Sequence, residues 1–310
     1  MMKIKHIFLL VGGMLITQGA NAQQDAMYTH YMFNTQAVNP AYAGNRGMLT
    51  MTLLHRSQWV GVKGAPMSQT FTLNTPIFRN KLGLGVSLQN DKIGPTNIFS
   101  GNLDLAYRLK LNKRNHLAFG IKGAFSNYDR NLRDLYADQS GDMAISNASQ
   151  NDMFLDFGIG LLYTHEHFYI GLSTPKTILY NFSGDDGMHV GGKEIQHFYF
   201  TAGGAVDLNA KTVWKPSTFL RVSYGAPITL DISSLFEFNK KFEVGAMWRS
   251  RDAIGVLLGY TFKESFRVGY SFDWSYGHET FKNNFGSHEV MLRYELFYKG
   301  KENITSPRYF

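Results

Sequence analysis

Residues 102–111 read NLDLAYRLKL, a stretch in which apolar and polar residues alternate. Its large apolar side chains fall on alternate positions, namely Leu103, Leu105, Tyr107, Leu109 and Leu111. The positions between them hold Asp104, Ala106, Arg108 and Lys110. An alternation with a period of two predicts a β-strand that has one apolar face and one small or polar face.

The same alternation recurs along the chain, whereas helical periodicity is weak. It appears in KLGLGVSLQ (81–89), HLAFGIKGAF (116–125), FLDFGIGLLY (154–163), SFRVGYSFDW (265–274) and VMLRYELFY (290–298). In each stretch one face is large and apolar, and the other holds glycine, small polar or charged residues. No apolar run after residue 22 approaches the roughly 18 residues of a spanning helix, so the pattern predicts an all-β protein.

The strands of a soluble β-sandwich also alternate between apolar and polar residues, but three details favour a transmembrane barrel. The segments run about 9–12 residues, enough to cross a bilayer at a tilt, whereas soluble strands usually have about 5–6. Tyr163, Trp248, Trp274 and Tyr298 lie at ends of the apolar face, as in the aromatic girdles of outer-membrane barrels. The glycine-rich opposite face suits a crowded lumen.

Connection lengths support the same interpretation. Alternation predicts fourteen antiparallel strands, at 47–56, 67–75, 81–90, 97–110, 115–127, 153–164, 166–173, 195–207, 213–224, 226–238, 242–249, 253–262, 264–274 and 287–298. With a periplasmic N-terminus, every long connection, such as 128–152, 174–194 and 275–286, falls on the outer side. Outer-membrane barrels have an even strand number, short periplasmic turns and longer outer loops. We therefore predict a closed barrel, which also removes every sheet edge.

The amino-acid composition excludes several kinds of protein and of functional site. The 310 residues include no cysteine, which excludes a disulfide scaffold, a cysteine-zinc site, a thiol nucleophile and a lipoprotein anchor. Charged residues make up 18%, against about 25% in typical soluble domains, and the net charge is +7. The cations are scattered rather than clustered, so we expect no nucleic-acid partner.

The first 22 residues are typical of a secretory signal peptide. Lys3 and Lys5 precede an apolar core over Ile7–Ile16, and Ala20 and Ala22 form an A-x-A cleavage site. Ten apolar residues are too few to span a membrane. We expect four parts: the signal peptide (1–22), an N-terminal periplasmic or plug segment (23–45), the barrel (46–298) and a periplasmic tail (299–310). The location expected is the outer membrane of a Gram-negative bacterium.

Patterns that could support catalysis or metal binding are weak. The loop over 128–152 holds Asp134, Asp138, Asp142 and Asp152, but without the spacing of a calcium loop. The stretch Tyr163–His167 (YTHEH) lacks the HExxH spacing and falls on a predicted turn. No G-x-S-x-G nucleophile motif occurs. We therefore expect neither an enzyme nor a cofactor.

Charged residues on the predicted inner face form a more informative set. They are Asp104, Arg108, Lys110, Lys122, Asp156, Glu243, Arg267, Asp273, Arg293 and Glu295. One interpretation is a lumen that selects solutes. The favoured one is mutual pairing inside an occluded lumen, because unpaired buried charge is costly and a fourteen-strand barrel lies between filled and open sizes.

Several blocks of the chain resemble a known family. They are YTHYMFNTQAVNPAYAG (28–44), HRSQWVGVKGAPMSQTFTLNTPI (55–77), GLGVSLQNDKIGP (83–95), SNYDRNL (126–132) and the final SPRYF (306–310). Together they resemble the PorP/SprF family of type IX secretion system outer-membrane proteins. The similarity is densest over residues 28–130, and the later strands match mainly by pattern.

The resemblance implies a barrel that serves protein export or surface attachment. In the family, members associate with periplasmic components of the secretion apparatus or pair with one large secreted adhesin, as in gliding motility. The expected partners are therefore an adhesin-like cargo protein, type IX secretion periplasmic components, or both, besides outer-membrane lipid. The identity of any cargo stays open.

We expect partner contacts at the ends of the barrel. The candidates are Tyr31, Phe33, Asn39, Pro40, Trp59, Val60, Lys63, Tyr276, His278, Phe281, Phe285, Tyr309 and Phe310. For the four residues before the first strand, packing as a plug is at least an equal expectation. The hypothesis is thus a non-enzymatic recognition barrel, with three alternatives: a channel for small or hydrophobic solutes, a barrel enzyme such as a lipid hydrolase, and a purely structural barrel.

Overall fold

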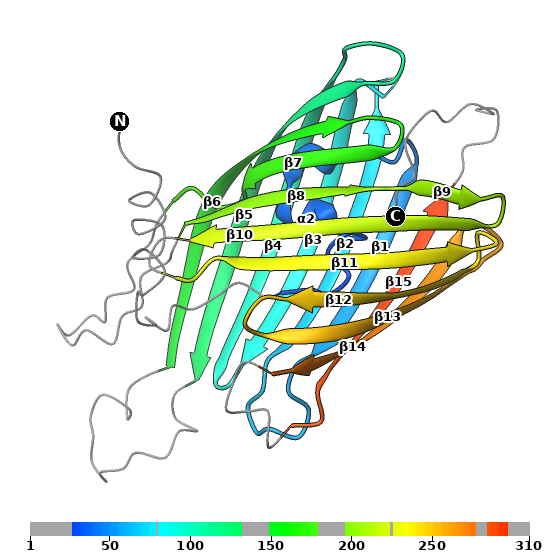
Figure 1. The fold of residues 1–310 in the computed structure, drawn as a ribbon. Helices are drawn as coiled ribbons and strands as arrows, with labels where there is room; N and C mark the ends of the chain where they lie inside the picture. Colours follow the sequence, from blue (N-terminus) through cyan, green and yellow to red (C-terminus); the bar gives the residue numbers. More distant parts are fainter. Residues whose placement is uncertain are drawn as a thin grey trace, which may run out of the picture.

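A computed structural model of the chain describes residues 27–78, 80–131, 149–178, 196–223, 226–276 and 284–296. Its strands form one antiparallel sheet (Figure 1). They are β1 (Leu49–Ser57), β2 (Met67–Ile77), β3 (Leu82–Ile93), β4 (Thr96–Lys110), β5 (His116–Asn131), β6 (Ser149–Thr164), β7 (Phe168–Thr174), β8 (His197–Gly204), β9 (Val206–Asn209), β10 (Thr212–Ser223), β11 (Thr229–Phe238), β12 (Phe242–Arg249), β13 (Ala253–Phe262), β14 (Phe266–Ser275) and β15 (Ser287–Leu296).

The sheet closes on itself because the first strand pairs with the last. β1 runs antiparallel to β15 with Leu53 opposite Leu292, and every other strand pairs with its neighbour in the chain. β8 and β9 are separated only by Ala205 and both pair with β10, so they make one interrupted strand. The described residues therefore form a closed fourteen-strand barrel, and the predicted fold is confirmed.

Burial follows the alternation of the sequence. In β4 the side chain of Asp104 is fully buried, whereas Leu103 and Leu105 on either side are 52% and 42% exposed. Most large apolar side chains of the strands point outward, and most inward-facing side chains are polar or small. A few large apolar side chains, among them Leu162, Met247 and Met291, face inward and pack in one cluster with residues 31–33. This inversion of a soluble protein's pattern is what a lipid environment requires of a barrel wall.

The two ends of the barrel differ. At one end, here called the turn end, adjacent strands are joined by two to five residues, for example 239–241 and 263–265. The other end, here called the loop end, carries the longer connections, including 58–66 and 276–286. Since outer-membrane barrels turn their long loops outward, the loop end faces the cell exterior.

Three strands, β3, β5 and β6, extend at least three residues further toward the loop end than the sequence predicts, and β3 continues to Ile93. β5 continues to Asn131 and β6 begins at Ser149, with Asp129 opposite Asn151 in the ladder. The prediction ended these strands early because it assigned the charged residues to a loop. Arg130 and Asp152 instead face each other across the two strands at 3.6 Å. Asp134, Asp138 and Asp142 lie outside the described residues.

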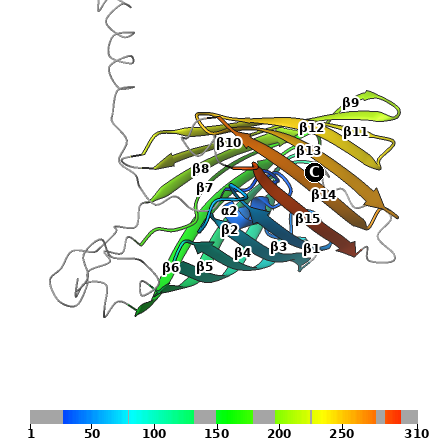
Figure 2. The same cartoon turned by 90° about the horizontal axis from the view of Figure 1, so that it is seen from below.

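Inside the ring of strands lies the N-terminal part of the chain. It includes a short helix, α2 (Thr35–Val38), and a single 3-10 turn, η1 (Pro40–Tyr42). Figure 2, turned from the first view, also shows α2 enclosed by the strands. No helix among the described residues is long and apolar enough to span a membrane.

Candidate functional site

Residues 27–48, here called the lumen segment, run through the barrel from the loop end to the turn end. Near the loop end, Thr70 of β2 donates a hydrogen bond to the Tyr28 hydroxyl at 2.7 Å. Midway, the Gln36 amide donates to Asp104 of β4 at 3.2 Å. Near the turn end, Arg46 pairs with Glu295 of β15 at 2.5 Å. The segment therefore spans most of the bore before the chain enters β1.

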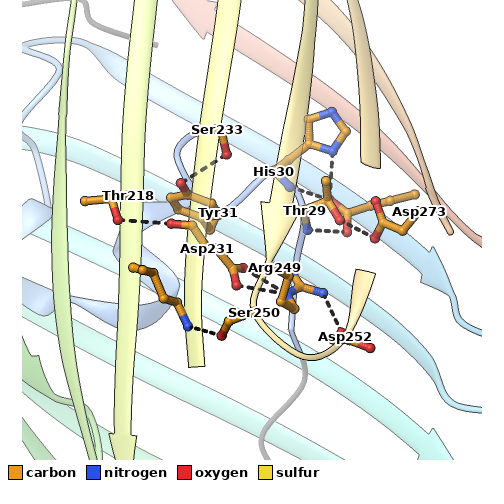
Figure 3. A network of polar contacts seen from close by, with 12 residues as sticks. Thr29, His30, Tyr31, Thr218, Asp231, Ser233, Arg249, Ser250, Asp252 and Asp273 are labelled. Atoms are coloured by element: carbon orange, nitrogen blue, oxygen red, sulfur yellow. Dashed lines mark hydrogen bonds and ion pairs between the residues drawn. The ribbon is translucent and has the colours of Figure 1, made fainter. Parts of the chain in front are cut away.

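A buried ion cluster fixes the start of the lumen segment. The Glu289 carboxylate accepts bonds from the backbone N–H groups of Thr29 and His30 at 2.9 and 2.8 Å. It also contacts His30 Nδ1 at 2.7 Å and Arg56 at 3.1 Å. Arg56 further pairs with Asp273 at 2.7 Å. Asp273 in turn accepts a bond from the Thr29 hydroxyl (Figure 3). Each charge thus has several partners, as burial in a low-dielectric lumen requires.

Tyr31 anchors the next turn of the segment to β10 and β11, a different part of the wall. Its hydroxyl lies 3.1 Å from the Ser233 hydroxyl of β11 (Figure 3). It also lies 3.0 Å from the Ser217 hydroxyl of β10, and its ring stacks on Phe219. These contacts make Tyr31 an anchor between the lumen segment and two strands of the wall.

The Phe33 ring lies close to two cations of the barrel wall. The guanidinium carbons of Arg267 and Arg293 are 5.0 and 5.2 Å from its ring centroid. These distances are within the range of cation–π attraction, which strengthens when the groups are desolvated. The arrangement ties the lumen segment to β14 and β15.

Asn39 starts the turn of η1 and holds it against the wall. Its side-chain oxygen accepts a bond from the Ala41 backbone N–H at 2.9 Å, and its amide donates to the Leu161 carbonyl at 3.1 Å. The inward-facing glycines make this close approach possible. A Cβ at Gly120 would overlap the Ala41 backbone, and one at Gly83 would overlap the Ala43 carbonyl. The small residues of the inner face thus leave room for the lumen segment.

Four residues predicted as partner contacts are therefore in the interior. Tyr31, Phe33, Asn39 and Pro40 are buried against the barrel wall. They form part of the plug rather than a surface that a partner could reach, because the aromatic side chains find their contacts inside the lumen. The structure thus places these four side chains inside the barrel, where the plug alternative puts them.

The charged residues expected in the lumen fall into separate groups. Asp104 lies 3.7 Å from Lys122, and Glu243 lies 3.3 Å from Arg267 and 3.1 Å from Lys215. Asp156 accepts bonds from the backbone N–H groups of residues 177 and 178. Arg108 donates to the Asn80 carbonyl at 3.4 Å. Lys110 lies exposed at the turn end.

Sequence reasoning missed several members of these groups. Arg56, Lys215, Asp231, Arg249 and Glu289 all occupy buried inward positions of strands. Arg249 forms a bidentate pair with Asp231, with nitrogen–oxygen distances of 2.9–3.0 Å. Alternation could have placed these five inside. It could not have found His30 or Arg46, which lie in the lumen segment, where no strand periodicity exists.

Two outer connections form a joined surface, here called the outer ledge (residues 59–60 and 285–286). The Val60 N–H donates to the Gly286 carbonyl at 2.9 Å, and the Phe285 N–H donates to the Val60 carbonyl at 2.8 Å. The Trp59 indole donates to Ser275 at 3.3 Å. Phe285 is 76% exposed, and Val60 and Lys63 are also exposed. The outer ledge therefore exposes the Phe285 ring on a backbone that is held by hydrogen bonds.

The remaining contact candidates divide between the ledge and undescribed residues. Tyr276, 45% exposed, follows β14, and its hydroxyl donates to the Arg249 carbonyl at 2.9 Å. His278, Phe281, Tyr309 and Phe310 lie outside the described residues. The His165–His167 stretch is the turn between β6 and β7, with Glu166 3.4 Å from Arg114. No group of metal-binding side chains occurs among the described residues.

Solved structures similar to this chain are outer-membrane barrels. A CymD monoaromatic hydrocarbon channel aligns with a TM-score of 0.50 and 10% identity, over 90% of this chain and 96% of that one. A Pseudomonas aeruginosa FadL homologue (TM-score 0.48, 11% identity, 84% and 93% covered) and the Acinetobacter baumannii outer membrane protein Omp33 (0.48, 8%, 81% and 100%) are also similar. At these identities only the fold is shared.

Comparison of the sequence with protein families identifies the family of the chain, which the similar structures do not. No curated protein matches the chain. The family model described as type IX secretion system membrane protein PorP/SprF matches residues 20–294, which include nearly all of the barrel and the lumen segment. The chain is an integral outer-membrane barrel that belongs to the PorP/SprF family of type IX secretion system membrane proteins.

Proposed function

We propose that this barrel is a non-enzymatic recognition component of type IX secretion, which binds a secreted adhesin-like cargo protein at its loop end. Its turn end would contact periplasmic components of the apparatus. The observation that carries the proposal is the lumen segment. Its side chains are buried among inward-facing side chains of the wall, so the bore is occupied and the rims are left for protein contact.

The outer ledge is the surface that fits this role best. Exposed aromatic side chains on a rigid backbone are typical anchors of protein interfaces, because they bury large area at low entropic cost. Phe285 has this character, and the reciprocal backbone bonds with Val60 hold it in place. The ring also covers Gly61, whose φ of +97° turns the first loop toward it.

The test is an affinity purification of the tagged protein from outer membranes in mild detergent, followed by mass spectrometry. Recovery of one large secreted protein in near-equal amount is the expected result. Periplasmic components alone would instead assign the protein to the core apparatus. An empty purification would contradict the recognition role.

A matched pair of variants locates the contact. Phe285→Ser removes the aromatic ring of the outer ledge, and Phe78→Ser removes an equally exposed ring (74%) at the turn end. We expect the first variant to lose most of the secreted partner and the second to retain it. Equal recovery with both variants would show that the ledge is not the docking surface.

A channel for small or hydrophobic solutes is the second candidate. Support for it is limited to the fold, since a monoaromatic hydrocarbon channel is among the similar barrels. The buried lumen segment argues against it. A steady conductance of the wild-type protein would favour the channel function over the recognition role.

A further inference from the structure

Three polar side chains form a row on the lipid-facing surface of the barrel. They are His55 on β1, Gln69 on β2 and Asn90 on β3, here called the polar row. Their positions are directly opposite in the ladder, His55 with Gln69 and Gln69 with Asn90. All three face outward, since the neighbouring Leu54, Arg56, Thr70 and Asp91 are buried on the inner side.

An apolar groove of about 400 Å³ adjoins the polar row. Its lining includes Leu53, Phe71 and Leu88, which are again directly opposite one another, one row nearer the turn end. Phe99 and Leu292 close its sides. The groove therefore begins at polar side chains and continues along hydrocarbon-facing ones. Its volume is within the range of about 300–1,000 Å³ typical of small-ligand sites.

This arrangement matches a lipid in shape and polarity. An acyl chain would cover Leu53, Phe71 and Leu88, as bilayer contact with this face requires. Polar groups at the border of the hydrocarbon need hydrogen-bond partners, because leaving them unpaired away from water is costly. Two carboxamides and an imidazole both donate and accept bonds, and carboxamides carry no charge. They suit headgroup hydroxyls better than a bare phosphate.

We propose that the groove binds a glycolipid of the outer leaflet, with an acyl chain along the apolar floor and sugar hydroxyls on the polar row. The leaflet follows from position, because the polar row lies nearer the loop end, close to where β1 ends and β2 begins. His55 Nε2 lies 3.1 Å from the Ser57 hydroxyl, a contact that orients the imidazole. This inference does not depend on the recognition role proposed above.

The experiment uses purified lipid A, an acylated diglucosamine, as the probe. The full-length protein is delipidated in detergent, and its Tm is measured with lipid A or with phosphatidylethanolamine. Two variants disrupt the site in different ways. Leu88→Trp fills the groove, and the double variant Gln69→Leu with Asn90→Leu removes two members of the polar row. Leu258→Trp on β13 is the control, since Leu258 is a lipid-facing residue of similar exposure outside the groove.

Lipid A is expected to raise the Tm of the wild type and of the Leu258→Trp control by several degrees more than phosphatidylethanolamine does. Both groove variants should lose this difference. An equal response to the two lipids, or an undiminished response of the groove variants, would overturn the proposal. Since the chain has no cysteine, Leu53→Cys adds a check for another occupant. A disulfide-linked dimer in native membranes would identify a second copy in the groove, again against the proposal.

Discussion

At the scale of single residues, Glu289 is the charge on which the lumen segment depends most. It contacts two backbone N–H groups, the Arg56 guanidinium and the His30 imidazole, all inside the barrel. Removing one partner of a buried ion pair leaves the other uncompensated, whereas exposed pairs contribute little. The contribution of an ion pair to the stability of this barrel therefore depends on whether the pair is buried in the lumen.

The first prediction compares two Glu→Gln substitutions. Glu289→Gln should destabilise the folded barrel by about 3–5 kcal/mol, because Arg56 and His30 lose a buried carboxylate. Glu166→Gln breaks only the exposed pair with Arg114 and should cost less than about 1 kcal/mol. Urea unfolding of the two variants measures the difference. Equal stabilities would contradict the assigned role of Glu289.

Pairing partners in the lumen could not be predicted from sequence. Alternation places Asp104 and Glu243 inside, but their partners depend on strand register and on the path of the lumen segment. Glu295 pairs with Arg46, which lies in a part of the chain without periodicity. The pairing partners can be identified only from a structure that places both the strands and the lumen segment.

At the scale of elements, strand β5 shows how its two faces differ. Gly120 faces the lumen segment, and Gly123 faces outward with no atom within 4 Å of a built Cβ. The two glycines lie three residues apart in one strand, so they share its backbone conformation and differ in surroundings. Substituting each of them in turn therefore distinguishes the effect of close packing from the effect of intrinsic strand preference.

The second prediction uses this pair. Gly120→Ala should destabilise the barrel by about 1–3 kcal/mol, because the added methyl overlaps the Ala41 backbone. Gly123→Ala should change stability by no more than about 0.5 kcal/mol. Thermal unfolding in detergent measures both. A tolerated Gly120→Ala would mean that the lumen segment does not pack against β5.

The strands themselves were largely predictable. Each predicted segment has a counterpart, because lipid on one side and a packed lumen on the other impose a strict period of two. The misplaced ends of β5 and β6 reflect charged residues that continue the ladder beyond the apolar belt. The break at Ala205 between β8 and β9 has no signal in the alternation.

At the scale of the whole molecule, the direction of the lumen segment has a topological consequence. Thr29 contacts Asp273 and Glu289 near the loop ends of β14 and β15, and Arg46 contacts Glu295 near the turn end. The described chain thus starts near the exterior and descends through the barrel before β1 begins. Its first described residues are closer to the cell surface than to the periplasm.

The third prediction tests this topology by labelling intact cells with a membrane-impermeant maleimide. The absence of cysteine provides a clean background. Met27→Cys should react, as should Lys63→Cys in the first outer loop. Lys263→Cys, in the turn between β13 and β14, should react only after lysis. Reaction of Lys263→Cys but not of Met27→Cys in intact cells would reverse the orientation.

In this structure the chain's own lumen segment occupies the bore. Single-channel recording in planar bilayers, with Glu289→Gln beside the wild type, measures whether the bore is closed. The wild type should show no steady conductance, and Glu289→Gln should show intermittent openings because the lumen segment is held less firmly. A steady, ohmic pore in the wild-type protein would contradict a closed bore.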